Sequence, residues 1–168
     1  MKPIILMIIR GKLVHGPMRG EGLVEHFYYR IIHTLKFEPF KGTLDVKTEK
    51  DIDIEKYATV VLDHILLDGR RMIDAYLCPA TIRHGEKEHK AWIIQKHKDV
   101  HNKGIIEVIS KDKIMDAMGL KYGDDIEVEI PDTKITKAGR RKELAMRFRR
   151  KKQDIRNIMS SDTTLMKS

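Results

Sequence analysis

The chain has 168 residues, 41% of them hydrophobic and 35% charged, which is typical of a globular protein and excludes a largely disordered one. No apolar run approaches the roughly 20 residues of a membrane-spanning helix, and the single cysteine excludes both an internal disulfide and a cysteine-based metal cluster, so we expect a cytoplasmic protein without a membrane partner. The net charge of +8 is confined to the C-terminal end, because residues 134–168 hold 12 Lys and Arg against 3 Asp and Glu, whereas residues 1–133 hold 21 against 22.

Most of residues 1–133 have the pattern of short β-strands. Apolar or alternating runs, separated by Gly, Pro, Asp and Asn, predict strands at 3–9, 43–47, 58–66, 72–78, 90–95, 105–109 and 126–130. Most connections are too short to hold a helix, so we expect a largely antiparallel or mixed sheet that forms a small barrel. The last of these strands is expected to close the barrel.

Two helices are predicted within this domain. Apolar residues at four-residue steps predict a first helix over Glu25–Leu35. A second, short helix is predicted near Lys111–Met118, with Ser110 as its N-cap and Gly119 at its C-terminal end.

After Pro131 the sequence changes to a polar linker and a basic segment. The segment at about 140–159 predicts an amphipathic helix with one apolar side, and the rest of its surface is mostly Lys and Arg. We therefore predict a domain over 1–133 and a basic extension over 134–168. The extension is either a solvated appendage or a nucleic-acid contact that neutralises phosphates.

A glycine-rich segment lies between the first predicted strand and the first predicted helix: Gly16, Pro17, Met18, Arg19, Gly20, Glu21 and Gly22. Its three glycines allow bare N–H groups to approach phosphate oxygens, and the start of a helix adds a partial positive charge. The spacing is neither that of a Walker A loop nor that of a Rossmann fingerprint. By itself the segment is either a phosphate-binding loop or an ordinary connection.

Polar side chains in two of the predicted strands are candidates for chemistry. Thr43 and Asp45 share one face of a strand, and a hydroxyl with a carboxylate suits a Mg²⁺ ion that keeps waters and bridges nucleotide phosphates. The alternative is an ordinary strand start with Asp45 in solvent. Glu107 stands within an apolar run, where a carboxylate needs a partner, either a ligand or a neighbour in the barrel. The scattered histidines lack the spacing of a zinc site.

The segment Phe37-Glu38-Pro39-Phe40-Lys41-Gly42-Thr43-Leu44-Asp45-Val46 resembles the pattern Phe-x-Pro-aromatic-x-Gly-Thr-Leu-Asn of archaeal CTP-dependent riboflavin kinases. The resemblance covers roughly residues 4–130, including the glycine-rich segment, the run at 105–109 and the turn at 120–124. It implies a mainly β fold, a small six-stranded cradle-loop barrel of the RIFT type with one or two short helices.

The resemblance also implies an activity, the phosphorylation of riboflavin to FMN with CTP as the donor and Mg²⁺ as the cofactor. It implies that Thr43 and Asp45 hold the metal and that Asp99 and Glu107 contact the flavin. Asp45 and Glu107 are the candidate catalytic residues, and the sequence does not decide whether either of them accepts the hydroxyl proton. The implied nucleotide contacts are the glycine-rich segment Gly16, Pro17, Met18, Arg19, Gly20, Glu21 and Gly22, and a second group, Lys111, Asp112, Lys113, Ile114 and Met115.

The sequence departs from the family pattern in three places. Asp45 stands where the family usually has Asn, and we expect the added charge to tighten the metal site. Leu23 and Val24 replace a basic and an aromatic residue, and Asp99 replaces a hydroxyl residue. These departures leave open an inactive protein that binds nucleotide. The basic C-terminal helix leaves open a second alternative, a DNA-binding barrel that uses this helix.

Overall fold

A computed structural model describes residues 5–16, 20–62, 66–67, 70–71, 74–96 and 104–132. The side chains of residues 20–22, 66–67 and 70–71 lie outside this description. Residues up to Asp132 belong to one compact unit. The predicted basic extension, with its helix at about 140–159, lies outside the described residues. Within the part that is described, no helix combines the length and the apolar character needed to cross a bilayer.

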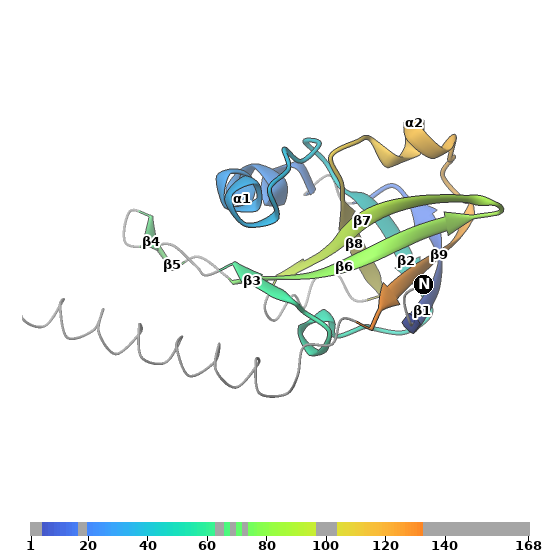
Figure 1. The fold of residues 1–168 in the computed structure, drawn as a ribbon, viewed down its shortest axis with the longest axis horizontal. Helices are drawn as coiled ribbons and strands as arrows, with labels where there is room; N and C mark the ends of the chain where they lie inside the picture. Colours follow the sequence, from blue (N-terminus) through green and yellow to red (C-terminus); the bar gives the residue numbers. More distant parts are fainter. Residues whose placement is uncertain are drawn as a thin grey trace, which may run out of the picture. The chain divides into compact units, whose positions relative to one another are not determined.

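Six antiparallel strands close into a barrel (Figure 1). They are β1 (Ile5–Val14), β2 (Leu44–Thr48), β6 (Ala75–His84), β7 (Lys87–Lys96), β8 (Ile105–Ile109) and β9 (Asp125–Pro131). Around the barrel their order is β6-β7-β8-β2-β1-β9, and pairing of β9 with β6 completes the circuit. The structure therefore confirms the mainly β, barrel-like fold, and the last predicted strand closes the barrel as expected.

The remaining elements lie outside this circuit. Strand β3 (Val60–Leu62) extends the sheet beyond β6, and the short strands β4 (Leu66–Leu67) and β5 (Arg70–Arg71) pair with each other. The helical elements are α1 (Gly20–Leu35), the 3₁₀ turn η1 (Ile54–Lys56) and α2 (Ile114–Met118).

Strands β6 and β7 form a longer hairpin than the apolar runs at 72–78 and 90–95 predict. Both strands continue through polar residues to the turn at Gly85, and Arg83 pairs with Glu88 across the hairpin at 2.7 Å. Pro79 lies inside β6, between the stretch paired with β3 and the stretch paired with β9. On this edge of β6, position 79 falls between the two paired stretches. A proline, which has no N–H to donate, is tolerated there.

The apolar side chains form two clusters on opposite faces of the barrel wall. The barrel interior holds one cluster, which includes Cys78, fully buried as a small core residue. Helix α1 covers part of the outer face and packs Phe27 and Ile31 against residues such as Leu77 and Ile94. The two periodicities, 3.6 residues for the helix and 2 for the strands, place these side chains on facing surfaces.

Both predicted helices differ from expectation at their first turn. Helix α1 begins at Gly20, five residues earlier than predicted, because Leu23 and Val24 also pack into the cluster beneath it. Helix α2 begins only at Ile114, and its N-cap is Lys113 rather than Ser110. At its other end Gly119 adopts the left-handed conformation, with φ of 64°, that a helix C-cap favours.

Candidate active site

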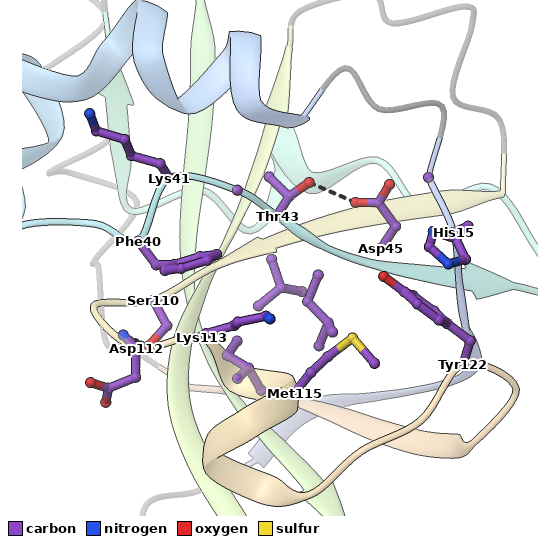
Figure 2. Close-up of a pocket in the computed structure, with 15 residues that line it drawn as sticks. His15, Phe40, Lys41, Thr43, Asp45, Ser110, Asp112, Lys113, Met115 and Tyr122 are labelled. Carbon is purple, nitrogen blue, oxygen red and sulfur yellow. Dashed lines mark hydrogen bonds between the residues drawn. The ribbon is translucent and has the colours of Figure 1, made fainter.

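A cavity of about 390 Å³ opens at one end of the barrel (Figure 2). Strand β2 is antiparallel to both β1 and β8. The start of β2 therefore lies beside the ends of β1 and β8, at the cavity. The cavity brings together Gly16, Thr43 and Asp45 with four residues from the second predicted nucleotide segment: Asp112, Lys113, Ile114 and Met115. Positions that are far apart in the sequence thus share one cavity.

Thr43 and Asp45 form a polar pair on one wall of the cavity. The Thr43 hydroxyl donates a hydrogen bond of 2.8 Å to Asp45 Oδ1. Only 6% of Asp45 is exposed, so burial raises the pKa of its carboxyl, and the hydrogen bond from Thr43 partly opposes that shift. The pair therefore presents a hydroxyl and a shielded carboxyl toward one region of the cavity.

Gly16 lies directly against this carboxyl. A Cβ atom built on Gly16 would lie 1.4 Å from Asp45 Oδ2 and 2.5 Å from Asp45 Cγ. Any side chain at this position would displace the carboxyl, so only glycine allows the chain leaving β1 to pass so close to it. The backbone at position 16 and the metal-ligand candidates are thereby held together.

The donor set fits Mg²⁺ better than a metal that the protein alone must enclose. In the described part of the chain, no three His, Cys, Asp or Glu side chains converge to hold an ion. A carboxylate and a hydroxyl would occupy two of the six positions around Mg²⁺ and leave the others to water and phosphate oxygens, as this ion prefers. Zinc, by contrast, prefers three or four protein ligands with nitrogen or sulfur atoms.

The turn before β9 places an aromatic residue against the end of β1. Leu13 N donates to Asp124 O at 3.0 Å, and Gly123 N donates to Leu13 O at 2.8 Å. These two bonds bring Tyr122 to His15, with 3.6 Å between the ring centroids. The two rings form one flank of the cavity in Figure 2.

The opposite flank joins the turn before β2 to the end of β8. Phe40 N donates to Ser110 O at 2.8 Å, and both residues line the cavity. Lys41 follows Phe40, and its Nζ atom lies 5.9 Å from the centroid of the Tyr28 ring on α1. Lys41 and Lys113 give the lining two cationic side chains, which suits an anionic ligand.

Glu107 lies beside the cavity rather than in its lining. It is 5% exposed, and strand register pairs its Cα with that of Asp45 on β2. Directly paired residues of antiparallel strands project to the same face, with Cβ atoms about 4.5–5.5 Å apart. The barrel therefore places two buried acidic residues next to each other on its outer face.

The other predicted site residues are distributed less compactly. Pro17, Met18, Arg19 and Asp99 lie outside the described residues. Gly20, Glu21 and Gly22 belong to the first turn of α1 rather than to a loop, since the buried stripe of that helix extends back to Leu23. Lys111 is exposed and is absent from the lining of the cavity.

Several lining residues were not predicted as site residues: His15, Phe40, Lys41, Ser110 and Tyr122. Phe40 and Lys41 lie within the segment that carries the family resemblance, so their position was a usable signal. The contact between His15 and Tyr122 had no signal in the sequence, because it depends on pairing between the first and last strands.

Residues 13–130 match a family model named for CTP-dependent riboflavin kinase. The description of this family is "Domain of unknown function DUF120". The chain belongs to the CTP-dependent riboflavin kinase family. The match includes every described residue that lines the cavity, from His15, just after β1, to Tyr122 before β9.

Curated relatives of this riboflavin kinase family member come from archaea. The riboflavin kinase of Ignicoccus hospitalis is 32% identical over 136 residues, which are 76% of this chain and 71% of the relative. The riboflavin kinase of Methanocella arvoryzae is 27% identical over 125 residues, and the match covers 73% of this chain but 56% of the relative. The riboflavin kinase of Saccharolobus solfataricus is 25% identical over 130 residues, which are 73% of each chain.

Proposed function

We propose that the chain transfers the γ-phosphoryl group of CTP to the terminal hydroxyl of riboflavin, giving FMN and CDP. The observation that carries this proposal is the convergence of Gly16, Thr43 and Asp45 with the 112–115 segment in one cavity of the family's domain. In this transfer a bond forms between the riboflavin oxygen and the γ-phosphorus, and the bond from that phosphorus to the β–γ bridging oxygen breaks.

Phosphoryl transfer requires alignment of the reactants and neutralisation of charge more than covalent chemistry from the protein. Thr43 and Asp45 would hold Mg²⁺, which supplies positive charge to the phosphate oxygens when bound. The backbone at Gly16 would approach the phosphates, and Lys113 would add a cation at the same cavity. These residues together account for binding of a triphosphate.

The hydroxyl proton needs an acceptor near the metal site. Asp45 would already give an oxygen to the metal, whereas Glu107 lies opposite it in the strand pairing. We therefore assign Glu107 to the flavin side, where its carboxylate would orient the hydroxyl and accept the proton. A Glu107→Gln variant should bind CTP normally and form FMN at least 100-fold more slowly, within the range typical of general-base removal.

The proposal is tested by incubating the purified chain with riboflavin, Mg²⁺ and each of the four ribonucleoside triphosphates in turn, with FMN measured by chromatography. We expect FMN in every preparation that contains CTP and Mg²⁺, with CTP the fastest donor and no product in EDTA. A Thr43→Ala/Asp45→Ala variant, purified in the same way, controls for contaminating kinases. Absence of FMN with all four nucleotides would refute the kinase, and faster turnover with ATP would refute the donor.

A further inference from the structure

Ser110 connects the two walls of the cavity through three contacts. Its carbonyl oxygen accepts the Phe40 N–H at 2.8 Å, and its hydroxyl oxygen accepts the Asp112 N–H at 3.2 Å. The same hydroxyl lies 3.0 Å from His89 Nε2. Ser110 is 4% exposed, so these contacts are shielded from competing water.

His89 reaches Ser110 from β7, the strand that pairs with β8. It lies on β7 two residues before Ala91, whose side chain belongs to the barrel interior, so the His89 ring projects to the same face. Its Nε2 atom also lies 3.6 Å from Asp112 Oδ2, and its side chain is 19% exposed. One imidazole nitrogen thus lies close to the side chains of both Ser110 and Asp112.

Strand β7 holds this segment at a second point. Lys87 Nζ donates to Met118 O at 3.3 Å, near the C-terminal end of α2. Residues 110–118, which supply one wall of the cavity, are therefore fastened to β7 near both ends. Of these two contacts, only the one from His89 involves Ser110, whose carbonyl oxygen also accepts the N–H of Phe40 in the turn leading to Thr43.

We propose that His89 is a positioning residue for the nucleotide, acting through Ser110 to set the distance between the Phe40–Asp45 wall and the Asp112–Met115 wall. This inference rests on the proposed function, which makes that cavity the nucleotide site. His89 does not line the cavity, so its effect on binding passes through the backbone of its neighbours. The residue would govern nucleotide affinity and leave the flavin side unaffected.

The test compares His89→Ala and His89→Gln with wild type, using calorimetry with CTP and Mg²⁺ and steady-state kinetics for both substrates. We expect His89→Ala to raise the Kd for CTP about fivefold to tenfold, the effect of one lost hydrogen bond. The KM for riboflavin should stay within twofold. The His89→Gln side chain has an amide N–H that can donate to the Ser110 hydroxyl oxygen. The change in log Kd for CTP should therefore be at most half as large in His89→Gln as in His89→Ala.

His84→Ala provides a matched control. His84 Nδ1 contacts Asp125 O at 2.9 Å, so this variant removes a histidine contact of similar length from the same hairpin, away from the cavity. It should leave the Kd for CTP within twofold of wild type. Thermal unfolding of all variants identifies any general loss of stability.

Coupling to Ser110 gives the decisive comparison. Ser110→Ala removes the hydroxyl through which His89 acts, so the His89→Ala/Ser110→Ala double variant should bind CTP no more weakly than Ser110→Ala alone. Additive losses, or equal losses in riboflavin and CTP affinity, would overturn the positioning role. If wild type binds CTP without forming FMN, the proposed function fails while the Kd comparison still tests His89. If wild type binds no CTP, both proposals fail.

Discussion

Replacing Gly16 by alanine should disrupt the proposed metal site while leaving the fold intact. The added Cβ would stand 1.4 Å from Asp45 Oδ2, whereas ordinary contacts begin at about 3.4 Å. The nearest obstacle is thus the carboxyl end of a side chain, and it must rotate away or the chain leaving β1 must move. Rotation breaks the 2.8 Å bond from Thr43 to Asp45.

The expected size of the effect follows from these contacts. Forcing an extra carbon into a packed site costs about 1–3 kcal/mol of stability. Misplacement of a reacting group by about 1 Å lowers turnover about 100-fold. We therefore expect Gly16→Ala to lower kcat/KM for CTP at least 100-fold and to require a higher Mg²⁺ concentration for half-maximal rate.

The assay is FMN formation at several Mg²⁺ concentrations, alongside thermal unfolding. Gly85→Ala is the control, because a Cβ there meets no atom within 4 Å and its φ of 60° imposes only backbone strain. That variant should lose some stability and keep the Mg²⁺ dependence of wild type. Wild-type activity in Gly16→Ala would refute the placement of Asp45 against position 16.

Three further predictions concern charge, packing and the basic extension. Burial raises the pKa of the Asp45 carboxyl above 3.8, so the folded state favours the neutral carboxyl. As pH rises through the folded-state pKa, this carboxyl loses its proton and the folded state becomes less stable. Asp45→Asn should therefore unfold at a higher temperature than wild type in EDTA at pH 7, with the difference vanishing near pH 3.5; a less stable variant at pH 7 would contradict this. Phe27→Ala should lower the free energy of unfolding, measured by urea denaturation, by about 3–5 kcal/mol, because Phe27 is 3% exposed. Tyr29→Ala is the control and should change this free energy little, because Tyr29 is 83% exposed. A chain ending at Asp132 should form FMN at the wild-type rate because every described lining residue precedes it. Fluorescence anisotropy with duplex DNA, before and after the truncation, tests the alternative of nucleic-acid binding.

Local sequence patterns predicted the parts of this site that depend on neighbouring residues. Thr43 directly precedes β2 and Asp45 is its second residue, and the period of two in extended chain places both side chains on one face. Gly119 ends α2 as expected, because a left-handed C-cap is a property of one residue and its immediate neighbours.

Long-range features could not be predicted in this way. The approach of Gly16 to Asp45 depends on the pairing of β1 with β2, and the contact of His89 with Ser110 depends on the packing of β7 beside β8. The start of α1 was misplaced because glycine is a weak helix former, while the burial of Leu23 that favours the helix arises only in the folded chain.

The central claim is that one divalent ion lies between Thr43, Asp45 and the phosphates of a cytidine nucleotide. A crystal of the chain grown with CDP and Mn²⁺ in place of Mg²⁺ tests it directly, because anomalous scattering locates the manganese. We predict a single peak within about 2.3 Å of both Thr43 Oγ1 and an Asp45 carboxylate oxygen, with the remaining ligands from phosphate and water. A nucleotide bound with its metal elsewhere, and with both side chains outside the coordination sphere, would contradict the account.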